Sequence, residues 1–262
     1  MINETLVHAR SLERIAPDGR IGVISLATDI NIEQDLRRIY PSTVEMFTSR
    51  VLNVNPLTIE NLRLMAPRIS DTAATILPGT PLDAIIYACT SGSAAIGIER
   101  LNELIHQSCP NVPVTNPISA SLAAFEVLGI QRISILTPYT HAVNAEVAQT
   151  FEDHGYEVLN IAGFGFENDT EMTYISPQDI AESAAKTCHP HADLLFISCT
   201  ALRASLVIEQ IEKQLRKPVV SSNQALAWHS LQLVGYIPPV TGYGQLLAYH
   251  SSKSPSNVAN TL

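Results

Sequence analysis

Two stretches of this sequence share one pattern, an apolar run that ends in a cysteine followed by a threonine. The first, at 84–93, reads Ala-Ile-Ile-Tyr-Ala-Cys-Thr-Ser-Gly-Ser, and the second, at 193–203, reads Asp-Leu-Leu-Phe-Ile-Ser-Cys-Thr-Ala-Leu-Arg. Each predicts a buried parallel strand that ends near the cysteine, followed by a turn of small residues that opens a helix. Cys89 and Cys199 are 110 positions apart (199 − 89), which indicates that one arrangement is used twice in the chain.

Three further features recur at similar offsets, between 105 and 112 positions. They are the apolar strands at 21–26 and 132–136, the proline-valine strands at 112–115 and 217–221, and the helix-ending glycines Gly129 and Gly235. The repetition predicts an internal duplication, an α/β chain of two halves that each hold a parallel sheet with helices on both faces. Ligands bind beyond the carboxyl ends of such strands, where both cysteines lie. If a pseudo-two-fold axis relates the halves, the two sulfurs face one another across one cleft.

The same repeat sets the expected domain organisation. We expect residues 1–117 to form the first half, residues 118–222 to form the second half, and residues 223–262 to return to the first half. The first twenty residues are expected to be a poorly ordered start or a short helix, and the polar end at 251–262 is expected to be frayed.

Composition narrows the class of protein and its partners. Hydrophobic residues make up 46% and charged residues 16% of the 262 residues, which indicates a compact globular chain. The net charge of −9 argues against nucleic acid as a partner, and no apolar run reaches the roughly 18 residues that a membrane span needs. The first twenty residues lack the apolar core of a signal peptide, so a cytoplasmic location is expected. The four cysteines contain no Cys-x-x-Cys spacing, and we expect them to be reduced and not to bind metal.

The residues that follow the two cysteines are small and mostly polar: Thr90, Ser91 and Gly92 after Cys89, and Thr200 and Ala201 after Cys199. Backbone N–H groups at the start of a helix are unpaired and can bind a carboxylate, and the neighbouring hydroxyls add donors. A helix N-terminus can also lower the pKa of a thiol from its usual value of about 8.5. The expected ligand is therefore a small mono- or dicarboxylate. The alternative is that Ser91 and its neighbours only cap a helix.

Two thiols on opposite faces of a planar carbon suit one class of reaction. One thiol adds to the carbon, or removes a proton from it, at one face, and the other delivers a proton at the opposite face. General acid–base groups of this kind typically supply about 10²–10⁴ in rate, and the scheme requires neither a metal nor an organic cofactor. The alternative is a structural role, because free cysteine is among the most buried residue types.

The chain resembles the aspartate/glutamate racemase superfamily, and within it the branch of maleate cis–trans isomerases, arylmalonate decarboxylases and ectoine-utilisation proteins. The resemblance covers about residues 20–245 and rests on four motifs: Ala-Cys-Thr-Ser-Gly-Ser at 88–93, Thr-Pro-Tyr at 137–139, Gly-Phe-Gly-Phe-Glu-Asn at 163–168 and Ser-Cys-Thr-Ala-Leu-Arg at 198–203. It implies two Rossmann-like halves with the active site between them. It also implies a homo-oligomeric isomerase that works without a cofactor.

The resemblance implies roles for individual residues as well. Cys89 matches the cysteine that attacks the alkene as a thiolate in maleate isomerases, and the adduct then permits rotation about the former double bond. Cys199 matches the second cysteine of the family, a proton donor and acceptor. Tyr139 and Asn168 match residues that bind the carboxylates of the substrate. Decarboxylases of this branch look to keep only the second cysteine, so the presence of both counts against decarboxylation.

Asp29 sets this chain apart from the maleate isomerases that it resembles. Those enzymes carry an asparagine after the first strand, whereas this chain has Ala-Thr-Asp at 27–29, a loop that looks more like the ectoine-utilisation type. A carboxylate at this place would repel a second substrate carboxylate and attract an ammonium group. An amino-acid-like substrate, or amino-acid racemisation, is therefore an alternative to cis–trans isomerisation. Asp29 could equally serve as the cap of a helix that opens near Ile32.

The sequence also admits functions other than that of an isomerase. A non-catalytic protein that binds small acids could use the same two-lobed cleft, although no segment for a further partner is visible. A thiol-based redox protein is disfavoured because the chain has no Cys-x-x-Cys. The run Cys-His-Pro-His at 188–191 invites a metal site, but it precedes the second cysteine strand and so belongs to the edge of the sheet opposite Cys199.

Overall fold

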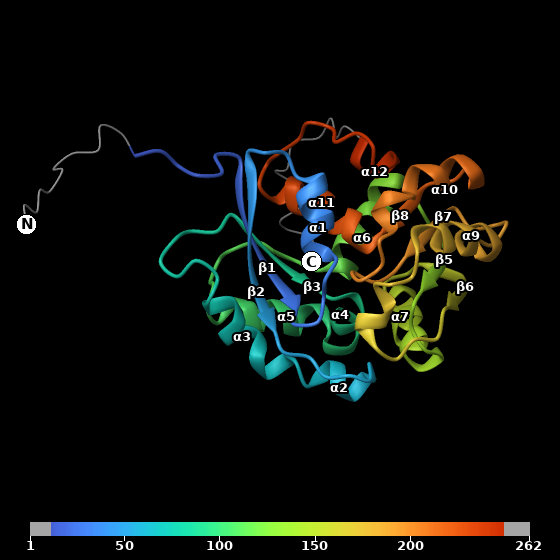
Figure 1. Cartoon of the computed structure of the whole chain (residues 1–262), viewed down its shortest axis with the longest axis horizontal. Helices are drawn as coiled ribbons and strands as arrows, with labels where there is room; N and C mark the ends of the chain where they lie inside the picture. Colours follow the sequence, from blue (N-terminus) through green and yellow to red (C-terminus); the bar gives the residue numbers. More distant parts are fainter. Residues whose placement is uncertain (1–11, 249–262) are drawn as a thin grey trace, which may run out of the picture.

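The computed structural model describes residues 12–248 and shows two four-stranded parallel sheets with helices packed around them (Figure 1). The first sheet has the order β2-β1-β3-β4 and the second has the order β6-β5-β7-β8, so the second half repeats the topology of the first. The strands are β1 (Gly19–Leu26), β2 (Val44–Val51), β3 (Ala84–Ala88), β4 (Val114–Thr115), β5 (Arg132–Thr137), β6 (Glu157–Gly163), β7 (Leu194–Ile197) and β8 (Val219–Ser221). The predicted α/β class with two duplicated halves is confirmed.

The two cysteine strands occupy equivalent places in their sheets. Every residue of β3 and of β7 is buried, because helices cover both faces of each sheet and a strand between them must be apolar throughout. The registers also correspond, since Ile21 of β1 pairs with Ala84 of β3 and Ile133 of β5 pairs with Leu194 of β7. Parallel pairing brings the carboxyl ends of these strands to one edge, so the residues after β1 and β3 lie together, as do those after β5 and β7.

Helices occupy the connections between the strands. They are α1 (Ile32–Ile39), α2 (Ile59–Arg63), α3 (Ala66–Ala74), α4 (Thr90–Ile96), α5 (Ile98–His106), α6 (Pro117–Leu128), α7 (His141–Asp153), α8 (Asp169–Met172), α9 (Pro177–Thr187), the 3₁₀ helix η1 (Ala204–Leu206), α10 (Ile208–Leu215), α11 (Ser222–Leu233) and α12 (Gln245–Ala248). The sequence predicts a helix over 177–187 and another that opens at Asn116-Pro117; α9 has the expected bounds, and α6 is capped by the Asn116 side chain.

Three predicted helices are broken in the structure. The sequence predicts single helices over 56–70, 94–107 and 204–215. The first is two helices, because Pro67 lacks the N–H that a continuing helix needs, and it stands at the start of α3. The second begins earlier, at Thr90, and is interrupted at Gly97, whose φ of 92° is not helical. The third is η1 followed by α10, with Val207 between them at a φ of −126°.

The two halves meet along helices. α6 packs against α11, and α4 packs against α7, so elements of both halves contribute to the interface. α11 also contacts α1 and β3, which places this late segment against the first sheet, as Figure 1 shows. The exact domain boundaries at residues 117 and 222 stay a prediction, and the predicted frayed end at 251–262 lies outside the described residues.

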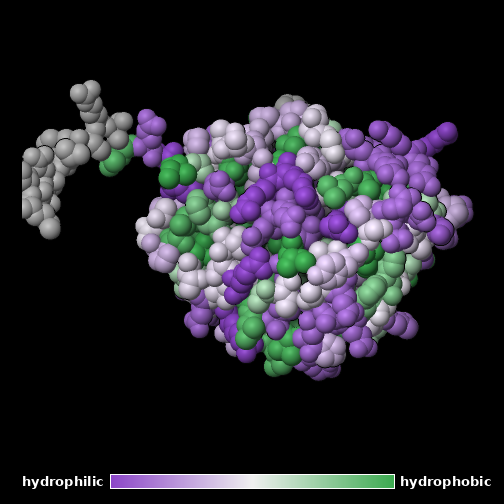
Figure 2. Space-filling model, in the orientation of Figure 1, coloured by the Kyte–Doolittle hydropathy of each residue, from purple (hydrophilic) through white to green (hydrophobic). Residues whose placement is uncertain are grey.

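The surface carries no large hydrophobic region on the face seen in Figure 2, which is mostly hydrophilic with small, separate hydrophobic patches. Among residues 12–248, none of the helices has the length and apolar character needed to cross a membrane.

Candidate active site

Cys89 ends the first cysteine strand and caps the helix that follows. Its Sγ accepts a hydrogen bond from the N–H of Gly92 at 3.2 Å, and the hydroxyl of Ser91 lies 3.7 Å away. Gly92 has to be glycine here, because an added Cβ would stand 2.6 Å from the Tyr87 hydroxyl and 2.9 Å from the Cys89 sulfur. The first turn of α4 is therefore wrapped closely around this sulfur, as the sequence predicts for the small residues after the strand.

Cys199 ends the second cysteine strand in a different way. Its φ is 119°, which is unusual for a residue other than glycine, and the N–H of Leu202 bonds back to its carbonyl at 3.4 Å to close a turn. The prediction that Thr200 and Ala201 open a helix is therefore wrong, since the next helical residue is Ala204.

The structure brings the two cysteine turns together through short polar contacts. Ser222, at the start of α11, accepts a hydrogen bond from the N–H of Cys199 at 3.0 Å, and its hydroxyl lies 2.8 Å from the hydroxyl of Thr90. The hydroxyl of Thr200 lies 3.4 Å from the carbonyl oxygen of Ala88. Contacts of this length hold the end of β3 directly beside the end of β7, and the charge of Cys89 raises the pKa of Cys199.

Burial controls the chemistry of both thiols in this closed arrangement. Cys89 is 4% exposed and Cys199 is 7% exposed. Burial raises the pKa of each thiol to about 12, although the Gly92 N–H at Cys89 and the Tyr139 hydroxyl at Cys199 act to lower it. The expectation that a helix N-terminus yields a lowered pKa at Cys89 is therefore wrong for this state, because desolvation of the thiolate outweighs the helix.

Tyr139 and Asp29, two of the predicted binding residues, lie beside the cysteines. Tyr139 is almost fully buried and its pKa is raised by burial, with the neighbouring thiols adding to the effect. Asp29 serves two purposes at once: its Oδ1 accepts the N–H groups of Asn31 and Ile32 at 2.8 and 2.9 Å, and its Oδ2 accepts the Thr200 hydroxyl at 2.9 Å. The contacts with Asn31 and Ile32 fit the expected capping of the helix that opens at Ile32, and the effect of Asp29 on the charge of a substrate stays a prediction.

Asn168 caps α8, and its neighbour Asp169 faces the first half of the chain. The Oδ1 of Asn168 accepts the N–H of Thr170 at 3.0 Å. Asp169 is buried and its carboxylate accepts hydrogen bonds from the side-chain amides of Asn53 and Asn55, each at 2.8 Å. The Thr28 hydroxyl bonds to the same carboxylate. The sequence interpretation missed Asp169, although it directly follows the last residue of the Gly-Phe-Gly-Phe-Glu-Asn motif, and the carboxylate-binding role of Asn168 stays a prediction.

Three more residues that support the site were not predicted: Asn31, Asp35 and Asn223. Their side chains are buried and meet beneath the turn that follows Cys199. A weak signal for one of them existed, because Asn223 follows a proline-valine strand in the second half, as Asn116 does in the first. Asn31 and Asp35 belong to the region around α1, which the sequence interpretation treated only as a helix that opens near Ile32.

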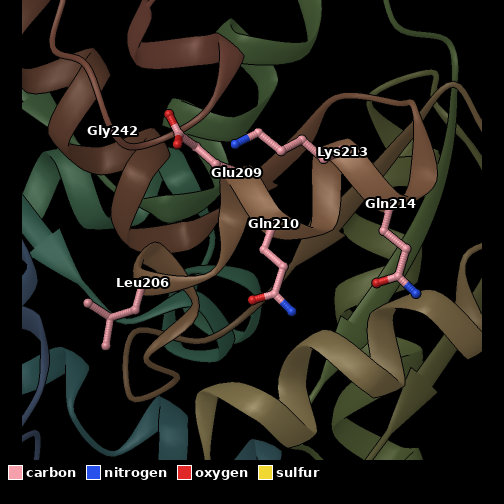
Figure 3. A pocket seen from close by; sticks show the side chains of 6 residues that line it. All are labelled: Leu206, Glu209, Gln210, Lys213, Gln214 and Gly242. Atoms are coloured by element: carbon pink, nitrogen blue, oxygen red, sulfur yellow. The ribbon is translucent and has the colours of Figure 1, made fainter.

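A metal site and a surface pocket are two other candidates for a functional site. Within residues 12–248 no three His, Cys, Asp or Glu side chains stand close enough to hold a metal ion. A surface pocket of about 630 Å³ is lined by residues of η1, α10 and the loop at Gly242, and Figure 3 shows its side chains on the exposed side of α10. None of the residues that line this pocket belongs to the two cysteine turns, so it is not the candidate active site.

Comparison with known proteins agrees with this architecture. The arylmalonate decarboxylase family matches residues 21–247. The maleate isomerase of Alcaligenes faecalis is 24% identical over 207 residues, covering 76% of this chain and 80% of that protein. The crystal structure of the maleate isomerase Iso from Pseudomonas putida S16 matches with a TM-score of 0.80 at 22% identity, over 88% of this chain and 98% of that one.

A second solved structure bears on cysteine chemistry. The maleate cis–trans isomerase of Nocardia farcinica, in a mutant with a covalently bound succinylcysteine intermediate, matches with a TM-score of 0.80 at 20% identity, over 89% of this chain and 99% of that one. The family match extends over most of the chain and includes both sheets, both cysteine turns and α11. The chain therefore belongs to the arylmalonate decarboxylase family, within the aspartate/glutamate racemase superfamily.

Proposed function

We propose that this protein is a cofactor-independent isomerase of small carboxylates that uses Cys89 and Cys199, with cis–trans isomerisation of the maleate type as its reaction. One observation carries the proposal: the ends of the two cysteine strands are held side by side, with Ser222 bonded to the backbone of Cys199 and to the hydroxyl of Thr90. The similarity to maleate isomerases over most of the chain supports it, and the presence of both cysteines supports isomerisation over decarboxylation.

In the proposed reaction the sulfur of Cys89 adds, as a thiolate, to one carbon of the substrate double bond. Cys199 gives its proton to the other carbon, so the double bond becomes a single bond and the substrate is held as a thioether. Rotation about that single bond follows. Cys199, now a thiolate, takes the proton back, and the carbon–sulfur bond to Cys89 breaks to release the trans product. Atoms and charges balance, and neither an oxidant nor a cofactor takes part.

The raised pKa of both thiols sets a condition on this scheme. At neutral pH a thiol with a pKa of about 12 is almost entirely protonated, so the closed state is not the state that attacks. Hydrogen-bond donors lie ready to stabilise a thiolate, the Gly92 N–H at Cys89 and the Tyr139 hydroxyl at Cys199. We expect access of water to the site to lower the pKa of Cys89, so that its proton passes to solvent before the attack, while Cys199 keeps the proton that it donates, because desolvation is the main cause of the raised pKa.

Single serine variants test the proposal. We expect Cys89→Ser and Cys199→Ser each to lower the rate of maleate isomerisation by about 10²–10⁴. Cys109→Ser is the matched control, because Cys109 is half-buried in the loop after α5, where its Sγ lies 3.8 Å from the carbonyl oxygen of Ala73 in α3. Product is measured by NMR. Full turnover in both site variants would contradict the proposal.

A second candidate, an amino-acid-like substrate, is favoured by the acidic groups at the site. Asp29 and Asp169 are both buried, and both raise the pKa of Cys89 after burial itself. A carboxylate near the reacting carbon would repel a dianion and attract an ammonium group. Incubation with a panel of amino acids in D₂O distinguishes the candidates, because racemisation exchanges the α-hydrogen for deuterium while cis–trans isomerisation of maleate yields fumarate.

The proposal also covers the location and the oligomeric state of the protein. We expect the enzyme to be a cytoplasmic homo-oligomer, as the sequence resemblance implies. Light scattering on the purified protein measures the oligomeric state, and a monomer at assay concentration would contradict this part of the proposal alone.

A further inference from the structure

A buried polar network lies beneath the turn that carries Cys199, and the reaction described above does not use it. Asp35 of α1 is fully buried. Its Oδ2 accepts a hydrogen bond from the amide of Asn223 at 2.8 Å and from the amide of Asn31 at 3.2 Å. The same two amides donate to the carbonyl oxygen of Thr200, at 2.9 and 3.0 Å respectively. One carboxylate thus orients two amides that converge on one backbone carbonyl.

The two asparagines do not serve as ordinary helix caps. The cap of α11 is Ser221, which forms a capping box with Gln224, and the Asn31 side chain makes no capping hydrogen bond to α1. Moreover, Oδ1 of Asn223 is buried and has no hydrogen-bond partner among the described residues. An unpaired buried polar atom costs about 1–3 kcal/mol. Stability alone would therefore favour an apolar residue at this position, whereas the NH₂ group of Asn223 has two partners.

The peptide unit between Thr200 and Ala201 links the two asparagine amides to the turn that follows Cys199. In a trans peptide the C=O and the N–H point in opposite directions. With the Thr200 carbonyl held by the two asparagines, the Ala201 N–H faces away from them, and a hydrogen bond from this N–H acts to lower the pKa of the Cys199 thiol. The φ of 119° at Cys199 costs about 1–3 kcal/mol and persists only where the surroundings impose it. The two amide hydrogen bonds supply such a constraint.

We propose that Asp35 is a positioning residue, which acts through the two asparagine amides to keep the Ala201 N–H aimed at the sulfur of Cys199. The proposal rests on the function given above for Cys199, which gives up and takes back a proton. After it has given up the proton, its sulfur carries a negative charge. A donor already in place stabilises that charge without reorganisation, which lowers the barrier to the proton transfer.

Alkylation of the two cysteines tests the proposal without relying on turnover. Asn31→Ala and Asn223→Ala each remove one hydrogen bond to the Thr200 carbonyl. Reaction with iodoacetamide between about pH 7 and about pH 10, followed by mass spectrometry of the two peptides, yields the rate at Cys199 relative to Cys89. We expect this ratio to fall about fivefold in each variant, because one hydrogen bond contributes about 1 kcal/mol. The pH profile of Cys199 should move to higher pH while that of Cys89 stays in place.

Variants of Asp35 separate its acceptor oxygen from its charge. Asp35→Asn retains an oxygen that can accept from both amides, so most of the alkylation ratio should remain. Asp35→Ala removes the acceptor, and the ratio should fall further than in either asparagine variant. Asn160→Ala is the matched control, because this amide donates to the Thr187 carbonyl at 2.7 Å on the edge strand β6 and has no contact with the network. It should lower stability and leave the ratio unchanged.

The outcomes distinguish this proposal from the proposed function. An unchanged ratio of Cys199 to Cys89 alkylation in folded Asn31→Ala and Asn223→Ala would overturn the positioning role, whatever the enzyme turns over. These two variants keep the test decisive if Asp35→Ala does not fold. A reduced ratio in a protein that converts no small carboxylate would support the positioning of Cys199 and contradict the proposed function instead.

Discussion

The hydroxyl of Thr200 donates a hydrogen bond to Oδ2 of Asp29 at 2.9 Å, and this bond joins the two halves of the chain. Thr200 follows Cys199 in the second half, and Asp29 follows β1 in the first. Because burial raises the pKa of Asp29, its carboxylate depends on such donors in place of water. The contact therefore stabilises the interface and, at the same time, fixes the turn next to Cys199.

Replacement of Thr200 with valine removes the hydroxyl and keeps the shape of the side chain, so it measures the contribution of the hydroxyl to stability. We expect Thr200→Val to lower the free energy of unfolding by about 1–3 kcal/mol, since it leaves a buried carboxylate oxygen without its donor. Urea unfolding measures the change. Thr72→Val is the control, because its hydroxyl bonds only to the Arg68 carbonyl on the exposed side of α3, and its effect should stay within about 0.5 kcal/mol. Equal effects at the two positions would contradict the importance of the Asp29 contact.

Gly92→Ala should damage both stability and the reactivity of Cys89. The added methyl group would stand 2.6 Å from the Tyr87 hydroxyl and 2.9 Å from the Cys89 sulfur, so one of them must move. Overpacking of this kind costs about 1–3 kcal/mol. Thermal unfolding and turnover of Gly92→Ala measure the two effects. The double variant with Tyr87→Phe removes the nearer atom and should recover part of the stability, and a lack of any recovery would show that the hydroxyl is not the obstacle.

The elevated thiol pKa values predict that the protein loses stability in alkaline solution. Cys89 and Cys199 have a pKa of about 12 in the folded state, against about 8.5 in an unfolded chain. Below about pH 8.5 both states keep the proton and the folded state is fully favoured. Above it the unfolded chain releases protons that the folded protein retains, so the free energy of unfolding falls by about 1.4 kcal/mol per pH unit for each thiol.

Denaturant unfolding between about pH 8.5 and about pH 10 measures this slope. We expect the Cys89→Ser, Cys199→Ser double variant to show a smaller slope than the unmodified protein, by an amount that approaches about 2.8 kcal/mol per pH unit toward pH 10, because two titrating groups are gone. Tyrosines of the unfolded chain also begin to ionise near pH 10, but this contribution is common to both proteins and cancels in the difference. Identical slopes in the two proteins would mean that the thiols are solvated in the folded state.

Removal of the charge of Asp169 should make Cys89 more reactive. Burial is the main cause of the raised pKa of Cys89, and the negative charge of Asp169 adds to it. We expect Asp169→Asn to increase the rate of Cys89 alkylation at a given pH, and to favour dicarboxylates over amino acids in substrate competition. The exposed carboxylate of Asp179, in the first turn of α9, is the control. A slower alkylation of Cys89 would contradict the electrostatic role of Asp169.

Local sequence patterns were sufficient for the parts of the fold that depend on local rules. The fully apolar runs of β3 and β7 predict buried parallel strands, and Asn116-Pro117 predicts the start of α6, because burial and capping act over a few residues. β2 was not predicted, although its residues largely alternate between buried and exposed as expected of an edge strand, because the adjacent apolar residues Met46 and Phe47 interrupt the alternation in the sequence.

The site was predicted where it follows a strand end and missed where it depends on distant contacts. Cys89, Cys199 and Tyr139 each lie one or two residues after the end of a strand, at the edge where ligands bind in parallel sheets. Asp35 and Asn223 are 188 positions apart and meet only because α11 returns to the first sheet. The direction of the thiol pKa values was also missed, because burial, which decides it, is a property of the assembled halves.

Covalent capture on the first cysteine tests the central claim most directly. The Cys199→Ser variant is incubated with maleate, and the intact protein and its peptides are weighed by mass spectrometry. If Cys89 adds to the double bond and Cys199 governs the proton, the variant should accumulate one equivalent of adduct on the peptide that contains Cys89, and none should form in Cys89→Ser. An unmodified Cys89 in folded Cys199→Ser, beside an unaltered protein that isomerises maleate, would contradict the account.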